Sequence, residues 1–433
     1  MAEITTKLPS STHAGEAEEK QTQSRSSASE RDGEAASWTI EEERKVVRKL
    51  DFYLMPLLVL GFFVLQLDRS NISNALTDTL TEDLGISSDD VNLGNQLMLA
   101  GIIIFELPSN VLLQKVGAPV WLTAQMGIWG TIALTQAWCT NIRSFYATRF
   151  LLGAFEGGYV PGGQYMLSLF YTKKELALRT AVFYFGNHFA TATGSLIAAG
   201  VLELGGTSGL SGWQWLFISA PDRQHSRYPI SLTRAPAVEG ILTLAIFALF
   251  VLLLPKSPAH TTPIHALYDL FSARDRAILT ARITADDPSK SHPNAPLTWP
   301  HLRAALLDPL PWLHLALNLV SLAPKGGLQL YGPTVIQALG FARAKANALN
   351  SVSSFLVVAF SAAISYASDA TRLRGPWCVA AFLYSIAFGA ALCGLPVGAG
   401  RWTRYWVFTL LGAGNALAQG LNDAGAAWGW RWR

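Results

Sequence analysis

The sequence contains little charge for its length. Only 15% of its 433 residues are Asp, Glu, Lys or Arg, whereas 50% are hydrophobic and 11% aromatic. In an average soluble domain about a quarter of the residues are charged. The composition therefore excludes an ordinary soluble domain and requires that part of the apolar surface face lipid.

The sequence is also poor in cysteine. Its three cysteines, Cys139, Cys378 and Cys393, lie far apart and form no Cys-x-x-Cys or Cys/His pattern, so neither a disulfide framework nor a zinc site is expected. Motifs for nucleotide phosphates, catalytic zinc or a serine nucleophile are missing, and no basic stretch interleaved with aromatic residues indicates nucleic acid. The sequence therefore predicts no cofactor, no metal, no nucleic-acid partner and no enzyme active site.

Long apolar segments take the place of charge. Several run for roughly 18 residues or more with almost no charge, which is enough for a helix to cross a hydrocarbon core about 30 Å thick. Six predicted spans precede a polar stretch and further spans follow it, which favours two similar halves in a lipid bilayer. The predicted spans are 54–76, 93–113, 120–139, 144–169, 180–202, 241–254, 312–339, 351–367, 377–395 and 405–421.

The spans divide the chain into four parts. Residues 1–48 are rich in small polar and charged residues and lack the apolar core of a signal peptide, so we expect a disordered cytosolic tail. Residues 49–254 are predicted to form an N-terminal six-helix bundle. Residues 255–310 are expected to be a cytosolic linker with short amphipathic helices, and residues 311–433 a C-terminal helical bundle.

The distribution of basic residues predicts the orientation of a multi-pass protein. Lys and Arg cluster before the first span, between the fourth and fifth spans and in the linker, which places these segments in the cytosol. The segment after the first span is acidic and has no Lys or Arg between Arg69 and Lys115, so it is expected outside. Basic residues near 343 and 401 weaken the rule in the second half.

Arg149 and Glu156 lie in the fourth span. Seven positions place them on one helix face about 10 Å apart along the axis, too far for a direct pair. Ionisable groups at membrane depth are costly unless they face a polar interior, so these two are candidates for a functional site. Arg149 would steady an anion and Glu156 would take up a proton; alternatively, both hold helices together through polar partners.

Two further charged positions lie in the first and second spans. Arg69 is a candidate to bind a carboxylate through two hydrogen bonds, with Asp68 balancing its charge, although an interfacial Asp/Arg pair is an equal alternative. Glu106 and Asn110 lie one turn apart on one face, and Pro108 between them favours a bend. For Glu106, proton coupling and a structural role both stay open.

Small residues recur every four positions in the fifth span. Gly186, Ala190, Gly194 and Ala198 predict a groove that another helix can approach closely, and Asn187 beside it is a candidate cavity residue.

The seventh span carries Lys325 and Gln329 after Pro324, which is expected to interrupt the helix. Both side chains are candidate substrate contacts. The alternative for Lys325 is a side chain that extends outward to water.

Five strings together resemble the major facilitator superfamily. They are LDRSNISNA, FELPSNVLL, RFLLGAFEGGYVPGGQYMLSLFYTKKE, GWQWLF and SDATRLRG, within a likeness that runs from about 49 to 422. More narrowly, they are similar to its anion:cation symporters, in the fungal allantoate permease branch. The resemblance implies an all-α membrane transporter of two helical bundles, with twelve helices, that works by alternating access.

The same resemblance implies a substrate and a mechanism. Proton entry would be coupled to uptake of a small organic anion, a carboxylate such as allantoate, nicotinate or a related vitamin, in the plasma membrane. Arg69 would meet the anion, and Arg149 with Glu156 would couple the proton.

The cytosolic loops resemble the superfamily's gating motif. In SDATRLRG, Asp369, Arg372 and Arg374 match the pattern. The corresponding loop of the first half keeps Lys115 and Gly117 but lacks the acidic residue, so the gating contacts are expected to differ between the halves.

Two departures accompany the resemblance. Residues 219–237 are an anomalous insert between GWQWLFI and the next apolar run, and we interpret them as an intron translated in frame. The resemblance also calls for two helices after the tenth span, so the bundle is expected to be truncated to about ten of twelve helices. A transporter-like sensor or an inactive truncated relative therefore stays open as an alternative, and a polytopic membrane enzyme is a weaker rival.

Overall fold

The described part of the protein is helical throughout. A computed structural model describes residues 38–202, 211–217, 239–265, 268–288, 299–322, 325–371, 374–396, 398–414 and 417, and no strand occurs in these ranges. We call residues before 255 the first half, 255–308 the linker and the remainder the second half. The fold is thus the predicted all-α class, and the expected insert at 219–237 lies outside the described residues.

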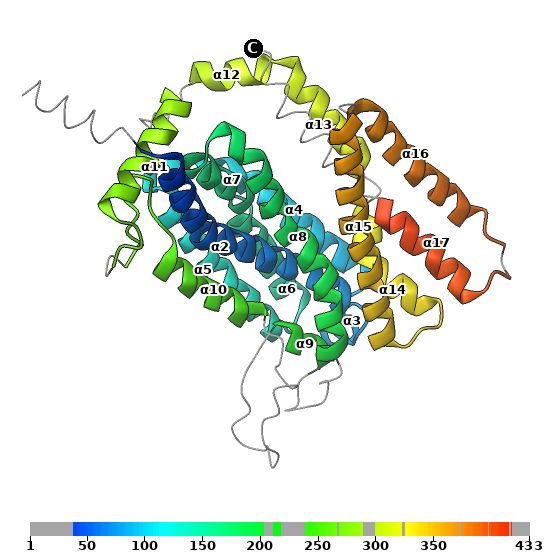
Figure 1. Ribbon diagram of the computed structural model, residues 1–433. Coiled ribbons are helices and arrows are strands. Elements are labelled where there is room, and N and C mark those ends of the chain that lie inside the picture. The colour runs from blue at the N-terminus through cyan, green and yellow to red at the C-terminus, as the bar shows by residue number, and fades with distance from the viewer. Residues whose placement is uncertain are drawn as a thin grey trace, which may run out of the picture.

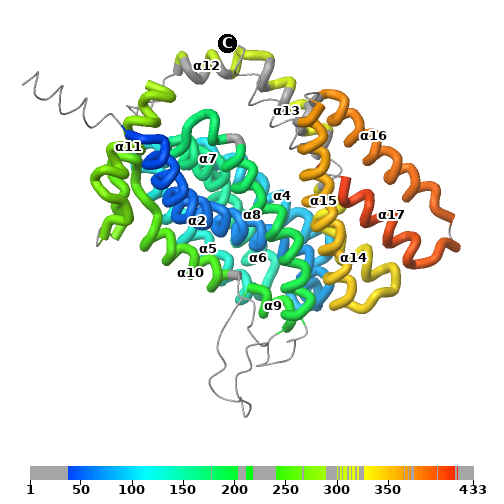
Figure 2. Tube along the Cα trace, in the orientation of Figure 1, coloured from blue at the N-terminus to red at the C-terminus, as the bar shows by residue number. Residues whose placement is uncertain are grey.

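The helices form two groups joined by the linker (Figures 1 and 2). The first half contains α2 (Ile40–Ala75), α3 (Leu80–Leu84), α4 (Ser88–Val116), α5 (Ala118–Thr135), the 3-10 helix η1 (Gln136–Trp138), α6 (Ile142–Glu156), α7 (Tyr159–Phe170), α8 (Lys173–Val201), α9 (Gly212–Phe217) and α10 (Glu239–Leu253). The linker contains α11 (Ala273–Asp286) and α12 (Trp299–Leu307). The second half contains α13 (Pro309–Leu322), α14 (Lys325–Ala338), α15 (Arg343–Thr371), α16 (Arg374–Cys393) and α17 (Arg401–Gly414).

Helix α2 begins earlier than predicted. The Thr39 side chain accepts from the backbone N–H of Glu42, and the Glu42 carboxylate accepts from the backbone N–H of Thr39, so a capping box starts the helix. Val46 and Val47 are already buried. The prediction of a disordered tail through residue 48 is therefore wrong for residues 40–48, because polar residues there form the solvated side of an amphipathic first turn.

The predicted fourth span is two helices. Helix α6 ends at Glu156 and α7 begins at Tyr159, with Gly157 and Gly158 between them. Pro161 lies in the first turn of α7, where a missing N–H costs nothing, but its ring cannot continue α6. A Cβ on Gly157 would lie 3.0 Å from the Ile102 carbonyl oxygen, so the break lies directly against α4.

Two described helices cover most of the predicted seventh span. Helix α13 extends to Leu322 and α14 starts at Lys325, and the interruption expected between them stays a prediction. Pro324 itself lies outside the described residues.

Glycines allow several helices to touch backbone to backbone. A Cβ on Gly153 of α6 would overlap the Met98 carbonyl oxygen of α4. Gly186 of α8 likewise meets the Val59 carbonyl of α2, and a Cβ on Gly194 would lie 2.9 Å from Leu67 Cδ2. The predicted groove on α8 is confirmed, and α2 occupies it.

Burial separates interior helices from those that face outward. By length and composition, four helices in the described residues could cross a membrane: Ile40–Ala75, Ser88–Val116, Arg343–Ser368 and Gly375–Cys393. Of their most apolar windows, 61% is buried in the first of these helices but only 6% in each of the last two. Helix α2 is therefore the central helix of the first half, whereas few residues in the apolar windows of α15 and α16 are fully buried.

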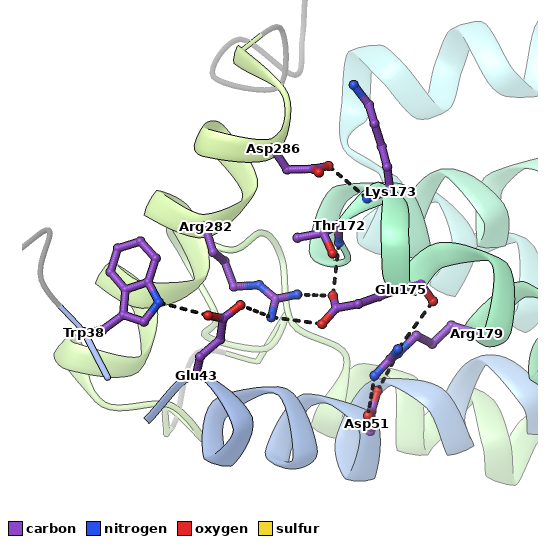
Figure 3. Close-up of polar contacts among 9 residues, drawn as sticks. All are labelled: Trp38, Glu43, Asp51, Thr172, Lys173, Glu175, Arg179, Arg282 and Asp286. Carbon is purple, nitrogen blue, oxygen red and sulfur yellow. Dashed lines mark hydrogen bonds and ion pairs between the residues drawn. The ribbon is translucent and has the colours of Figure 1, made fainter. Parts of the chain in front are cut away.

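The linker packs against the first half through α11 (Figure 3). Arg282, nearly fully buried, forms ion pairs with Glu175 at the start of α8 and, at 3.5 Å, with Glu43 at the start of α2. Lys49 Nζ pairs with Asp275 at 3.0 Å. Burial raises the pKa of Asp275, but hydrogen bonds from the Ser272 backbone and Lys49 lower it more, so its net value lies below the usual range.

For the linker that was predicted to contain amphipathic helices, the structure adds that one face of α11 is buried. Ile278, Leu279 and Ile283 are buried on the same helix as Arg282. This linker helix therefore packs on the first half and is more than a solvated connection.

We predict that Arg282→Gln lowers the free energy of unfolding by about 1–3 kcal/mol, because Glu43 and Glu175 would lose their shared cation in a partly buried setting. Thermal unfolding in detergent is the measurement. Arg276→Gln is the control, because Arg276 pairs with Asp269 in a partly exposed position and its loss should cost under about 1 kcal/mol. Equal losses would contradict the special role of Arg282.

We also predict that Gly153→Ala lowers the free energy of unfolding by about 1–3 kcal/mol, because α4 and α6 would have to separate. Gly200→Ala in α8 is the matched control. A Cβ there meets nothing within 4 Å, so the better helix former should leave stability unchanged or raise it by about 0.5–1 kcal/mol. Thermal unfolding of both variants decides, and a loss at Gly200 as large as at Gly153 would argue against close packing as the cause.

Candidate functional site

Five ionisable side chains gather in the interior of the first half. Asp68 and Arg69 come from α2, Glu106 from α4, and Arg149 and Glu156 from α6. Electrostatic interactions connect Glu106 with Arg69, and Asp68 with both Glu156 and Arg149. We call these five residues the charged cluster. Three separate helices therefore bring their charged groups to one region.

Arg69 and Glu156 form the direct contact of the cluster. Arg69 Nε lies 2.7 Å from Glu156 Oε2. The Glu156 side chain is fully buried, whereas 24% of the Arg69 side chain is exposed. The guanidinium therefore connects a buried carboxylate to a more accessible region.

The pair leaves hydrogen-bonding capacity on both partners. Within the described residues, the two terminal nitrogens of Arg69 have no hydrogen-bond partner, and neither does Glu156 Oε1. Two parallel N–H groups are what a guanidinium uses to bind a carboxylate bidentately. The geometry leaves Arg69 able to accept an anion, and a free carboxylate oxygen on Glu156 is able to accept a proton.

Arg149 is fully buried, and its hydrogen-bond partners among the described residues are neutral. Its terminal nitrogens lie 3.4 Å from Gln136 Oε1 and 3.3 Å from Asn95 Oδ1, and its guanidinium lies 5.9 Å from the centre of the Phe145 ring. It does not bond directly to Glu156, as the spacing predicted. These contacts join α4, η1 and α6. Arg149 therefore connects helices in addition to supplying positive charge.

Asp68 is buried in the interior. Only 1% of it is exposed, Thr243 Oγ1 of α10 donates to Oδ2 at 3.4 Å, and Oδ1 has no hydrogen-bond partner among the described residues. The alternative of an interfacial Asp68/Arg69 pair is therefore wrong. Adjacent helix positions point about 100° apart, so Arg69 meets Glu156 while Asp68 turns towards α10.

Glu106 lies at the more open side of the cluster. It is half-buried, interacts electrostatically with Arg69 and makes no hydrogen bond to another described residue. Helix α4 continues through Pro108 without ending. The carboxylate is therefore available to solvent or to a ligand that approaches Arg69.

Of the remaining predicted site residues, the three whose side chains the structure describes lie apart from the charged cluster. Asn187 is half-buried on α8, Gln329 is exposed on α14 and Lys115 is exposed in the last turn of α4, and no hydrogen bond among described residues connects any of them with the cluster. Lys325, Asp369 and Arg374 lie in helices, but their side chains are outside the described part, and Arg372 lies outside the described residues altogether.

Metal-binding groups and cavities give no second site of this kind. Among the described residues, no three His, Cys, Asp or Glu side chains are arranged to hold a metal ion. A hollow of about 510 Å³ lies in the second half and shares no residue with the charged cluster. It is lined by Val335, Leu339, Leu392, Leu395, Pro396, Arg404 and Phe408.

Comparisons with known proteins agree with this architecture. The model of the Major Facilitator Superfamily matches residues 58–220, which include the whole charged cluster. An uncharacterized transporter of Saccharomyces cerevisiae is 34% identical over 256 residues, which cover 59% of this chain and 44% of the relative. A protein of Agrobacterium vitis named "Putative tartrate transporter" is 40% identical over 176 residues, covering 41% of this chain and 40% of the relative.

Solved structures show the same fold. An inward-open structure of an Escherichia coli xylose transporter matches with a TM-score of 0.62 at 14% identity, covering 87% of this chain and 81% of the other. These relatives and structural neighbours are transporters and not enzymes. The matched segments span less than half the length of the two curated relatives.

We predict that Arg69→Met lowers the free energy of unfolding by about 2 kcal/mol, because the buried Glu156 loses its cation. Glu156→Gln in that background should recover part of the loss, with a coupling of about 1–2 kcal/mol in a double-mutant cycle measured by thermal unfolding. Arg143→Met is the control, since Arg143 is exposed on the same helix as Glu156. Additive effects at Arg69 and Glu156 would rule out an energetic pair.

Proposed function

We propose that this chain is a multi-pass membrane transporter that carries small organic anions across the membrane together with protons. The match to the Major Facilitator Superfamily over residues 58–220 and the fungal transporters among the relatives support this proposal. The proposed substrates are carboxylates, such as allantoate, nicotinate or a related vitamin, and the proposed mechanism is alternating access. The proposed location is the plasma membrane.

The contact between Arg69 and the buried Glu156 is the observation that carries this proposal. A guanidinium with two uncommitted N–H groups suits a carboxylate ligand, and its partial exposure leaves it reachable. Arg149, fully buried nearby without a directly bonded carboxylate, adds positive potential. A neutral substrate would not need two cations at this depth.

Proton coupling follows from competition for Arg69. When Glu156 is ionised, its negative charge pairs with the Arg69 guanidinium and weakens the attraction of that guanidinium for an anion. A proton on Glu156 removes this competition, so the protonated site binds a carboxylate better. Loss of the proton on the other side of the membrane would then favour release of the anion.

Asp68 and Glu106 extend the same logic. Asp68 is a second buried carboxylate of the charged cluster, and its Oδ1 has no hydrogen-bond partner among the described residues. Glu106 acts on Arg69 from the more exposed side. We infer that Asp68 shares the proton with Glu156 and that Glu106 tunes the entry of the anion.

The name of one relative supports an anionic substrate. Tartrate carries two carboxylates, and the protein so named is 40% identical to this chain over 176 residues. This similarity places tartrate beside the monocarboxylates as a compound to test.

We predict that cells expressing this chain take up at least one labelled anion among tartrate, nicotinate and allantoate faster at pH 5 than at pH 7.5. Glu156→Gln should remove the acid stimulation, because position 156 no longer titrates, and Arg69→Met should abolish uptake of the same anion. The exposed Arg143→Gln variant should transport like the parent chain.

The outcome also separates transport from the alternative of a sensor or inactive relative. No uptake of any of the three anions by a chain shown to be at the cell surface would overturn the proposed substrate class. Uptake without acid stimulation would support the proposed anion substrate and contradict proton coupling.

A further inference from the structure

The hydrogen bonds and the ion pair described between the two halves gather at one end of the protein. This end contains α3 and α9, where the segment between Arg69 and Lys115 is acidic, and we call it the acidic end (Figure 1). Helices α14 and α15 approach α2, α4 and α8 there. The contacts are Tyr331 Oη to Asn92 Oδ1 at 2.6 Å, Asn347 Nδ2 to Thr77 Oγ1 at 2.9 Å, Asn350 Nδ2 to Ser195 Oγ at 3.0 Å, and an ion pair between Arg343 and Asp78.

The ion pair is the charged member of this set. Asp78 follows α2 in the first half, and Arg343 begins α15 in the second. The Asp78 side chain is only 3% exposed, against 32% for Arg343. Arg343 also donates to the backbone oxygen of Leu202 at 3.1 Å, so one side chain of the second half holds two segments of the first.

Contacts within the first half orient the Asp78 carboxylate independently of Arg343. Its Oδ2 accepts from the backbone N–H of Trp213 at 2.7 Å, while Arg343 binds Oδ1. The Trp213 indole donates in turn to Asp83 at 2.7 Å. A Cβ on Gly212 would lie 2.6 Å from Asp78 Oδ2, so only glycine permits this approach. The carboxylate is therefore oriented by the first half alone and presents one free oxygen to the second.

We propose that the Asp78–Arg343 ion pair is a lock that holds the two halves together at the acidic end and sets the population of the state in which that end is closed. The inference rests on alternating access as part of the proposed function. Opening this end requires these contacts to break, and the ion pair is the one among them in which two opposite charges would have to separate. The hydrogen bonds of Asn347 and Asn350 fix the register of α15 against it.

The distance between the halves at the acidic end tests the lock directly. Spin labels at Glu82→Cys and Ala342→Cys, both exposed positions on opposite halves, would report that distance by pulsed electron paramagnetic resonance on the full chain, with Cys378 and Cys393 replaced by Ser. Cys139 is buried and is kept. No substrate is present, so the result does not depend on the transport assay.

We expect Asp78→Asn and Arg343→Gln each to raise the ratio of separated to joined halves about threefold to tenfold. Asn at 78 still offers an oxygen to the Trp213 N–H, so α9 should stay in place. Arg343→Lys keeps the charge and should have a smaller effect. Lys345→Gln is the matched control, since Lys345 carries the same charge two positions away and lies over the Phe341 and Trp402 rings of its own half.

An unchanged distance distribution in monodisperse Asp78→Asn and Arg343→Gln protein would overturn the lock, and so would an equal shift in Lys345→Gln. If both lock variants lose helical circular dichroism, the ion pair is a folding contact and the proposal is wrong. A shift in the distance between the halves, with no anion uptake in the transport assay, would support the lock and contradict the proposed substrate.

Discussion

The cost of burying charge governs the first half of this protein. Arg149 and Glu156 are fully buried and Asp68 nearly so, and a lone ion at such depth would be strongly destabilising. Arg69 offsets part of this cost by bonding to Glu156 from another helix. The arrangement of α2 and α6 therefore depends on one charged contact, and neither helix could bury its own charge alone.

Close helix packing makes that contact possible. Gly153 lets α6 touch the backbone of α4, and Gly186 lets α8 touch the backbone of α2. With larger residues the helices would separate, and the polar partners of Arg149 on α4 and η1 would move out of reach. The small residues thus act on the charged cluster indirectly, through the distance between backbones.

The two ends of the first half are stabilised by different charges. At one end Arg282 of the linker joins the starts of α2 and α8 (Figure 3), and at the other Arg343 of the second half binds Asp78. The Arg282 contact joins the linker to the first half, so it would be kept if the two halves moved as rigid bodies. The Arg343 contact joins the two halves, so the same movement would break it. The proposed lock therefore lies at the end where the charged contact joins the two halves.

The sequence by itself determined the all-helical class of the protein and the approximate positions of its apolar segments, but not the break within the fourth of them. Composition and the length of apolar runs required helices in lipid, because unpaired backbone groups cannot be left there. It also marked Arg69, Arg149 and Glu156 as candidates for a site, since ionisable groups in apolar segments are rare, and it excluded a direct Arg149–Glu156 pair from helix geometry alone.

Only the tertiary structure decided which charges meet. Asp68 and Arg69 are neighbours in the chain but face different helices, and Arg282 and Arg343 find partners 107 and 265 residues away. The break after Glu156 was missed because Gly157 and Gly158 are compatible with a continuous helix unless α4 lies against them. Such pairings depend on how helices rotate and pack against one another, and a periodic pattern in one segment contains no information about the segment it will face.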